Sequence, residues 1–394
     1  MGLTGRASPL RASAVRGLPY LCVRLSVGLL LAGLPAAAFE PLPRAAPGSL
    51  AIDPVRLDQA FAALEAAPGR RAAVVVRDGF VVGERYWVGS EESLHHLRSV
   101  TKSFTSTLVG LALEREMIES IDSRMVDYLP WHLQPSDRAK DAITLRHLLS
   151  MTSGFQWSEN NEIIEWLAEP DPVRFILDRP LESPPGSDFT YNTAASHLLS
   201  VVLTEVTDSA HREFADTYLF DPLGITNWQW DSDPQGYPYG GHGLQLRTED
   251  LAKFGVLFLD RGLWHGKQVI SGEWVVDASD MQVELGVGFG PLSDIHYGFL
   301  WWLDRGLEHR VFIAWGWGGQ FVFCVPALEL VVATSADWWV PLDQANVQEI
   351  AILDVIVDEL LPAVSDQDPF RPSGRDKTRQ QRPFDIRPRP NWTP

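Results

Sequence analysis

The sequence is poor in cysteine and in lysine. Its 394 residues include only two cysteines, Cys22 and Cys324, and only five lysines, and acidic side chains outnumber basic ones to give a net charge of −18. So few cysteines exclude a small disulfide-rich scaffold. The acidic balance argues against a protein that binds nucleic acid, because such binding needs clustered cations. With 45% apolar and 21% charged residues, the chain is expected to fold into a globular protein.

The chain also lacks a long hydrophobic run. The apolar segment Leu25–Leu34 is shorter than the roughly 20 residues needed to cross a bilayer. A basic segment precedes it and the small residues Pro35–Ala38 follow it, which predicts a signal peptide over 1–38 with cleavage near Ala38. We expect a periplasmic or secreted protein without stable membrane insertion after signal removal. An uncleaved membrane anchor is the alternative. After cleavage only Cys324 remains, so no intramolecular disulfide can form.

Charge is distributed unevenly along the chain. Residues 1–38 carry +4 and residues 363–394 carry +3, which leaves −25 for residues 39–362. The C-terminal segment 363–394 is rich in Pro and Arg without apolar periodicity, which predicts a disordered basic tail. We therefore expect one folded domain over 39–362.

Several catalytic motifs are absent. The sequence has no Gly-x-Ser-x-Gly elbow, no His-Glu-x-x-His pair and no Gly-Lys-Ser/Thr phosphate loop. His95 and His96 have no ligand partners at metal spacing, and we expect them to be structural or to line a pocket. No metal or organic cofactor is predicted.

Strand patterns occur early and late in the domain, with helical patterns between them. Residues 72–87 read as a hairpin around Asp78-Gly79, and the i, i+4, i+7 apolar spacing in 99–114 predicts a helix. Residues 118–235 look mostly helical. Four further strands at 297–302, 310–314, 320–325 and 328–333 and a final helix at 343–361 are predicted.

This order of elements predicts an α+β fold. The simplest assembly is an antiparallel sheet flanked by helices and built from both chain ends, over about 47–117 and 236–362. The helical part, about 118–235, is then an inserted subdomain, and a cleft between the two parts is the expected site.

The first candidate motif is Ser99-Val-Thr-Lys102 at the start of the predicted helix. Positions i and i+3 share a helical face, so the amine of Lys102 can reach the Ser99 hydroxyl and take its proton. Burial and the helix N-terminus would both favour a neutral amine. An N-capping serine beside a solvated lysine is the alternative.

Two further motifs stand near the ends of predicted elements. Tyr191 follows a Pro/Gly loop and can pass a proton to a leaving group, or it can be an ordinary half-buried aromatic residue. The segment 315–320, Trp-Gly-Trp-Gly-Gly-Gln, can bring backbone close to a ligand, and a strand-edge N–H paired with that of Ser99 would form an oxyanion hole. A tight turn with packed tryptophans is its alternative.

The order and spacing of these motifs resemble the serine β-lactamase and penicillin-binding-protein superfamily, especially its esterase and 6-aminohexanoate-dimer-hydrolase branch. The resemblance covers roughly residues 47–361 and includes the segments 143–154, 219–225 and 241–255. It implies a β-lactamase-like fold and an acyl-enzyme mechanism.

The resemblance implies a role for each motif. Ser99 would be the nucleophile, Lys102 its general base and Tyr191 the group that shuttles a proton to the leaving group. The oxyanion hole and substrate-binding residues would be Ser99, Gln320, Trp317, Gly318, Gly319 and Asn192, with the backbone N–H groups of Ser99 and Gln320 as the two donors.

Two departures bear on the substrate. The family's tyrosine motif usually ends in Asn two residues after Tyr, where this chain has Thr193, with Asn192 beside Tyr191. Trp317 stands where β-lactamases place a cation or polar group. Both favour a neutral ester or an uncharged amide as substrate. The resemblance itself implies an esterase or a linear amidase that is similar to 6-aminohexanoate-dimer hydrolase. The alternatives are β-lactamase or D-alanyl peptidase activity, or a non-catalytic penicillin-binding-like sensor.

Overall fold

The computed structural model of the chain describes residues 41–129, 138–207 and 211–364. The predicted signal peptide and all but the first two residues of the predicted tail lie outside these ranges. Within them, no helix is both long enough and apolar enough to cross a membrane. Cys324 is a free, buried thiol, packed in the sheet.

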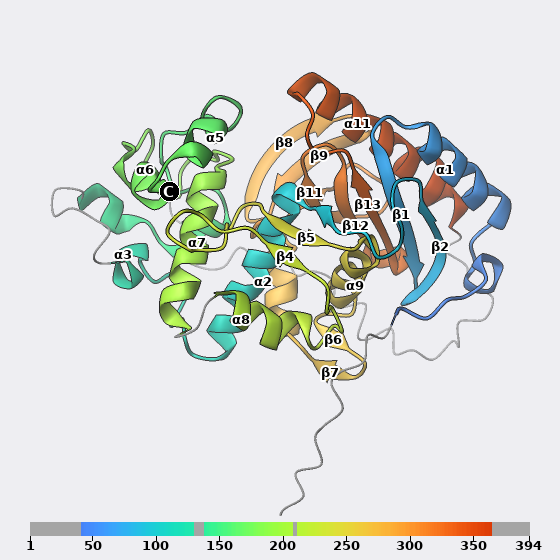
Figure 1. The fold of residues 1–394 in the computed structure, drawn as a ribbon, viewed down its shortest axis with the longest axis horizontal. Coiled ribbons are helices and arrows are strands. Elements are labelled where there is room, and N and C mark those ends of the chain that lie inside the picture. The colour runs from blue at the N-terminus through green and yellow to red at the C-terminus, as the bar shows by residue number, and fades with distance from the viewer. Residues whose placement is uncertain (1–40, 130–137, 208–210, 365–394) are drawn as a thin grey trace, which may run out of the picture. The chain divides into compact units, whose positions relative to one another are not determined.

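An eight-stranded antiparallel sheet forms the centre of the fold (Figure 1). The two N-terminal strands lie at one edge and β1 pairs directly with the last strand, so both ends of the domain contribute to one sheet. This confirms the predicted α+β architecture. In spatial order the strands are β2 (Phe80–Tyr86), β1 (Arg70–Arg77), β13 (Leu330–Ala336), β12 (Gln320–Val325), β11 (Val311–Gly316), β10 (Trp302–Asp304), β9 (Leu292–Tyr297) and β8 (Val283–Phe289).

The β1–β2 hairpin forms as its turn sequence predicts. Asp78 and Gly79 have φ values of 51° and 80°, and both central residues of a type I′ turn need this left-handed region. The turn also matches the twist of the two strands that it joins.

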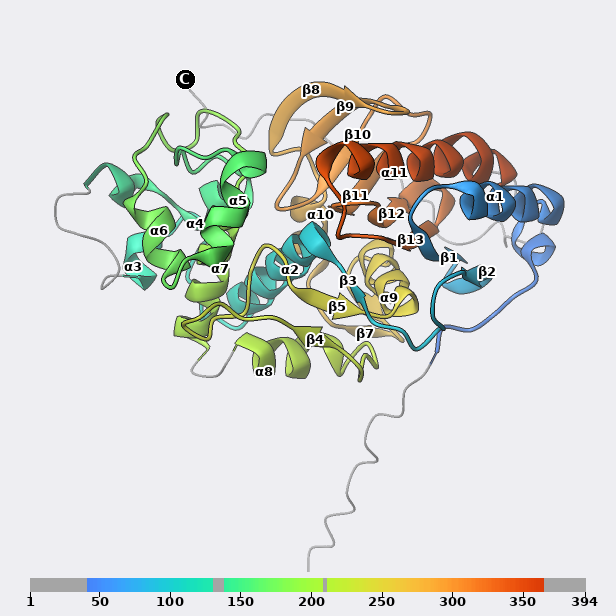
Figure 2. The ribbon, with the colours of Figure 1, turned by 45° about the horizontal axis from the view of Figure 1, so that its top comes forward.

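Helices cover both faces of the sheet. Side chains alternate along each strand, so Val75 and Phe323 join one apolar core while Val74 and Val322 join the other. Helices from the two chain ends cover the first face and two helices from the middle cover the second (Figure 2). The first pair is α1 (Pro54–Ala66) and α11 (Leu342–Asp354), which continues as the π-helical η6 (Val355–Leu360), and the second pair is α2 (Thr101–Glu114) and α9 (Thr248–Leu259).

The predicted helical part is packed around α7, which contacts α2, α4, α5 and α6. Its helices are α3 (Met125–Tyr128), α4 (Leu145–Leu149), α5 (Glu159–Ala168), α6 (Pro172–Asp178), α7 (Thr193–Val206), α8 (His211–Ala215) and the π-helical η4 (Asp216–Phe220). A small sheet has the strand order β3 (His95–His96), β5 (Leu244–Leu246) and β4 (Gln229–Trp230). Its first strand, β3, comes shortly before α2 in the sequence. The remaining named elements include α10 (Gly272–Ala278), β6 (Leu263–Trp264), β7 (Lys267–Gln268) and the 3₁₀ turns η1 (Pro47–Leu50), η2 (Arg98–Val100), η3 (Arg138–Ala142), η5 (Pro326–Leu328) and η7 (Leu361–Ala363).

One predicted strand is wrong. Residues 297–302 do not form a strand, because β9 ends at Tyr297 and β10 begins at Trp302. The chain turns between them through Leu300, whose φ is 61°, and the N–H of Gly298 donates to the carbonyl of Trp301 at 2.8 Å. The aromatic residues of this run suggest a strand, but they pack inward from a turn. The strand β8 and all but the last residue of β9 lie before the first predicted late strand, so the sequence patterns predict neither.

Candidate active site

Ser99 lies in the 3₁₀ turn η2, directly before α2. Arg98, the residue before it, has a φ of 51°, an uncommon conformation for a side chain larger than glycine. The turn is held at its base, where the N–H of Leu97 donates to the carbonyl of Leu244 at 2.9 Å. The nucleophile candidate is thus placed by a strained turn at the start of a buried helix.

Lys102 lies one turn further along and is 1% exposed. Its Nζ is 3.0 Å from Ser99 Oγ, 2.8 Å from Thr193 Oγ1 and 3.0 Å from the carbonyl oxygen of Gly241. Burial lowers the pKa of Lys102 to about 7, while the charge of Glu159 raises it and that of Arg98 lowers it. Lys102 is therefore not a solvated lysine, and a large fraction is the neutral amine near neutral pH.

Tyr191 lies in the segment before α7 and reaches the same two residues. Its hydroxyl interacts with the Ser99 hydroxyl, and its ring centroid is 4.7 Å from Lys102 Nζ. The ring stacks on Trp302 at 5.5 Å between centroids and meets Tyr297 edge-on at 6.3 Å. Burial, reinforced by the charge of Glu159, raises the pKa of Tyr191, so its hydroxyl stays protonated at neutral pH.

The structure adds Thr193 and Glu159 to the site. Thr193 Oγ1 accepts from Lys102 and donates to Glu159 Oε1. The other carboxylate oxygen, Oε2, accepts from the Thr193 N–H at 2.9 Å and from the Trp157 indole at 2.7 Å. The sequence marked Thr193 only as a departure from an expected Asn. Glu159 has no local signal, because it comes from α5, distant along the chain from both Lys102 and Thr193.

Asn192 lies directly before α7. Its side-chain oxygen accepts from the N–H of Ala195 at 2.7 Å, so it is the N-cap of α7, and it is 1% exposed. Its Nδ2 is buried with no partner in the part of the chain that the structure describes. This placement does not favour the predicted contact with substrate.

The third motif lies in the hairpin between β11 and β12. Gly316 ends β11, and a Cβ there would be 2.3 Å from the carbonyl oxygen of Leu97, so this strand end contacts the chain just before Ser99. Residues 317–319 form the turn. The N–H of Gly318 donates to Glu349 at 2.6 Å and that of Gly319 to the carbonyl of Gly316 at 3.2 Å. Neither is therefore free to bind substrate.

Gln320 begins β12, between two neighbouring strands. Its side-chain amide bonds both backbone groups of Ala336, at 2.9 and 3.0 Å, which links β12 to the end of β13. Because strand N–H groups point toward neighbouring strands, this position does not favour Gln320 as oxyanion donor. The Trp317 indole donates to the carbonyl of Val340 at 3.1 Å, so this tryptophan is packed, while its own backbone N–H lies just beyond the strand end.

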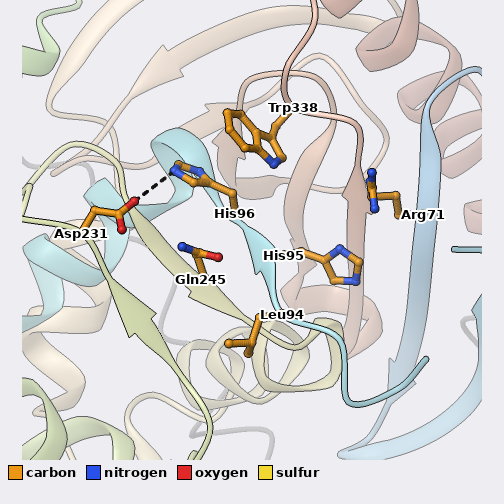
Figure 3. A pocket seen from close by; sticks show the side chains of 7 residues that line it. All are labelled: Arg71, Leu94, His95, His96, Asp231, Gln245 and Trp338. Carbon is orange, nitrogen blue, oxygen red and sulfur yellow. Dashed lines mark ion pairs between the residues drawn. The ribbon is translucent and has the colours of Figure 1, made fainter. Parts of the chain in front are cut away.

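A cavity of about 380 Å³ is lined in part by His95 and His96, the residues of β3 (Figure 3). His96 stacks on Trp338 at 4.6 Å and accepts from the backbone N–H of Arg98 at 3.1 Å, and the Arg98 guanidinium lies 5.5 Å from the Trp338 ring. Burial lowers the pKa of both His95 and His96 to about 4, so both are neutral. The residues that line the cavity are Arg71, Leu94, His95, His96, Asp231, Gln245 and Trp338.

The two histidines are therefore pocket-lining, as predicted. Within residues 41–129, 138–207 and 211–364, no group of three or more His, Cys, Asp or Glu side chains is arranged to hold a metal ion.

The sheet, the buried lysine beside a serine and the apposed tyrosine define a serine hydrolase of the β-lactamase fold. The beta-lactamase family profile matches residues 57–356, and the chain belongs to this family. It is 24% identical to the 6-aminohexanoate-dimer hydrolase of Paenarthrobacter ureafaciens over 289 residues, which cover 68% of this chain and 72% of that protein.

Solved structures share the fold. A Bacillus anthracis protein provisionally named as a 6-aminohexanoate-dimer hydrolase superposes with a TM-score of 0.68 at 21% identity, covering 83% of this chain and 89% of its own. EstCE1, a hydrolase with promiscuous acyltransferase activity, superposes with a TM-score of 0.64 at 17% identity, covering 79% and 99%. At these identities the likeness supports the fold.

Proposed function

We propose that the protein hydrolyses a small ester or linear amide through an acyl-enzyme on Ser99. The observation that carries this proposal is the 3.0 Å contact between Ser99 Oγ and the amine of Lys102, whose pKa burial lowers to about 7. A serine hydroxyl becomes an effective nucleophile when a neighbouring base takes its proton. At neutral pH a substantial fraction of Lys102 is able to do so.

The two candidate bases are separated by their pKa values. Lys102 can be neutral at neutral pH, whereas Tyr191 has a raised pKa and remains a protonated phenol. Lys102 therefore takes the Ser99 proton as the oxygen attacks the carbonyl carbon. Tyr191, which interacts with Ser99 and faces Lys102, passes its proton to the leaving group and takes the proton from the Lys102 ammonium in return. Water then attacks the acyl-enzyme with the same groups acting in reverse.

The developing oxyanion needs two backbone donors. The first is the N–H of Ser99. For the second, Gln320 follows from the family resemblance, while the geometry of the hairpin favours Trp317, because Gly316 contacts the chain before Ser99 and Trp317 is the next residue. The Gly318 N–H already donates to the Glu349 side chain and the Gly319 N–H to the carbonyl of Gly316.

The aromatic wall beside Tyr191 favours an apolar acyl or leaving group. Trp302 and Tyr297 pack against the Tyr191 ring, so a substrate held against this wall contacts apolar surface. The similarity to 6-aminohexanoate-dimer hydrolase, together with this wall, supports a linear amide or ester. Export through residues 1–38 remains a prediction of the sequence.

Arg98 favours a second candidate function. Its charge acts on Lys102 and is itself influenced by Glu159 and Tyr191, so a cation lies beside the site that the sequence suggested to be neutral. A substrate carboxylate near the scissile bond, as in D-alanyl peptides or β-lactams, would be attracted to it. Hydrolysis of p-nitrophenyl esters, linear amides, D-amino-acid amides and a cephalosporin by the same preparation distinguishes these classes.

The first test is chemical labelling of Ser99. A fluorophosphonate is expected to add one adduct to the intact protein, mapped by peptide analysis to Ser99, and Ser99→Ala is expected to lose both the adduct and at least about 10³-fold of ester turnover, on the order seen when a serine nucleophile is removed. Ser106→Ala is the matched control. Its buried hydroxyl lies on α2, the helix that follows Ser99, and has no partner in the described part of the chain, so its loss is expected to leave both readouts unchanged.

A folded protein without an adduct would support the non-catalytic sensor instead. Circular dichroism of the unlabelled protein establishes that the fold is intact. Ester turnover that survives in Ser99→Ala would likewise overturn the proposal.

A further inference from the structure

Lys102 has three polar neighbours, and their chemistry fixes the direction of each hydrogen bond. The Gly241 carbonyl can only accept. The Thr193 hydroxyl has one proton, which it donates to the Glu159 carboxylate, so it too can only accept from Lys102. The third neighbour, Ser99 Oγ, can donate or accept. A neutral amine has two N–H groups and one lone pair.

The arrangement therefore leaves one place for the lone pair. The two N–H groups of neutral Lys102 go to Thr193 and Gly241, and the lone pair points to the Ser99 hydroxyl. Were the Thr193 proton free to turn, it could donate to Lys102 and occupy the lone pair. Ser99 would then lose its base, although the contact between Lys102 and Thr193 would remain.

We propose that Glu159 is a positioning residue that holds the Thr193 hydroxyl as an acceptor toward Lys102 and so directs the Lys102 lone pair to Ser99. The inference rests on the proposed role of Lys102 as general base. As the Ser99 oxygen forms its bond to the substrate carbonyl carbon, its proton moves to Lys102, and the resulting ammonium keeps Thr193 and Gly241 as acceptors for its other two N–H groups.

Two N–H donors fix the carboxylate itself. Glu159 Oε2 accepts from the Thr193 backbone at 2.9 Å and from the Trp157 indole at 2.7 Å, which leaves Oε1 to accept from the Thr193 hydroxyl. The acid comes from α5, which contacts α7 (Figure 1). A helix outside the three motifs therefore sets the direction of the Lys102 lone pair. This assigns a purpose to threonine where the family usually has asparagine.

Glu159→Gln is a nearly isosteric substitution that replaces the acceptor facing the Thr193 hydroxyl by a donor. The same two N–H donors hold the single carbonyl oxygen of the introduced amide in the place of Oε2, which turns the NH₂ group of that amide toward Thr193 Oγ1. That NH₂ donates, so the Thr193 proton must point elsewhere, and Lys102 is its nearest acceptor. We expect kcat for an uncharged ester to fall by about 10- to 100-fold with little change in KM.

The pH profile gives a second readout. The charged and titratable groups that face Lys102 are Glu159, Arg98, Tyr191 and His242, along with the Ser99 hydroxyl. Since Glu159 stabilises the protonated lysine, Glu159→Gln should move the acid limb of kcat/KM to lower pH while the plateau falls. A merely structural role for Glu159 would lower the midpoint of thermal unfolding and leave the acid limb in place.

A double-mutant cycle makes the test specific. The side-chain oxygen of an asparagine at position 193 only accepts and needs no carboxylate to orient it. Glu159→Gln should therefore cost less than about 3-fold in a Thr193→Asn background, against about 10- to 100-fold in the wild type. If Thr193→Asn does not fold, Thr193→Val serves in the same cycle, because without a hydroxyl the exchange at 159 has nothing to reorient.

Glu162→Gln is the matched control on the same helix. Glu162 pairs with Arg179 at 2.5 Å and accepts from the Ser158 N–H, away from Lys102, so its kcat and acid limb should be those of the wild type. An unchanged kcat in Glu159→Gln, or an equal loss in both backgrounds at 193, would overturn the inference. Failure of the wild type itself to label at Ser99 would instead overturn the proposed function.

Discussion

A comparison with a second buried lysine, Lys253, shows why Lys102 can act as a base. Lys253 is also fully buried, but its Nζ lies 3.1 Å from Asp250 Oδ1, a carboxylate on the same helix. Among the described residues, Lys102 makes no ion pair within 4 Å, and the hydrogen-bond partners of its amine are the hydroxyls of Ser99 and Thr193 and the carbonyl of Gly241. A buried ammonium that lacks a carboxylate partner gives up its proton more easily. Lys102 is the one whose surroundings suit a base.

The pH dependence of turnover should reveal this base. Because the neutral form of Lys102 accepts the Ser99 proton, kcat/KM for an uncharged ester is expected to rise as pH increases through about 7 and then to level off. Below that value it should fall about tenfold per pH unit as the ammonium form accumulates. Initial rates between about pH 5 and 9 measure the profile. A rate independent of pH from about 6 to 8 would contradict the assignment of Lys102 as base.

At the scale of residues, the sequence predicts Ser99, Lys102 and Tyr191 as catalytic candidates, but it predicts no role for Thr193 or Glu159. The three candidates belong to short motifs whose spacing is visible in the chain. The roles of Thr193 and Glu159 depend on which group donates and which accepts each hydrogen bond. That depends in turn on which side chains are in contact in the folded protein. Asn192 shows the converse, because its cap to Ala195 is a local feature that a family motif obscured.

At the scale of elements, the β11–β12 hairpin is held from outside by α11. Glu349 accepts from the Gly318 N–H at 2.6 Å and from the Trp315 indole at 3.0 Å, and burial raises its pKa to about 7. Gln348, its neighbour on the helix, donates to the carbonyl of Gly318 at 2.9 Å. The turn that completes the candidate oxyanion hole is thus fixed by a helix from the end of the domain.

Gly316 is the point at which this hairpin touches the nucleophile's turn. A methyl group there would lie 2.3 Å from the carbonyl oxygen of Leu97, a backbone atom that cannot rotate away. Gly316→Ala should therefore push β11 away from η2 and lower kcat/KM by at least about 100-fold, as expected when an oxyanion donor is displaced. Steady-state kinetics, with circular dichroism to verify the fold, measure the effect.

Gly48→Ala is the control for this substitution. No atom lies within 4 Å of a Cβ at Gly48, so the variant should keep wild-type kinetics. Full activity in Gly316→Ala would show that the close approach of strand and turn is not needed for the reaction.

At the scale of the whole domain, the sequence predicted the sheet's composition better than its details. The hairpin at Asp78-Gly79 and the late strands follow local patterns, and these patterns favour one antiparallel sheet from both chain ends. The pairing of β1 with β13 has no local signal, because it joins segments some 260 residues apart in the sequence. The aromatic run from Tyr297 to Trp302 misled for a different reason, because aromatic residues are common in strands, whereas here they pack inward from a turn.

The two faces of the sheet divide stability from chemistry. The core that includes Phe104 lies on the same face as α2 and the candidate active site, while the core that includes Leu353 lies under α1 and α11. Leu353 is 0% exposed, and removing a buried leucine side chain costs about 2–5 kcal/mol of unfolding free energy. A change in that second core should weaken the fold without altering the reacting groups.

Leu353→Ala tests this division. We expect a lower urea midpoint by an amount that corresponds to about 2–5 kcal/mol, together with wild-type kcat and an unshifted acid limb once active sites are counted by fluorophosphonate labelling. Leu342→Ala is the control, because Leu342 begins the same helix but is 44% exposed, so its loss should change neither quantity measurably. A fall in kcat per labelled site in Leu353→Ala would show that packing in the core under α1 and α11 affects Ser99. The most direct connection is α11, whose Glu349 holds the β11–β12 turn.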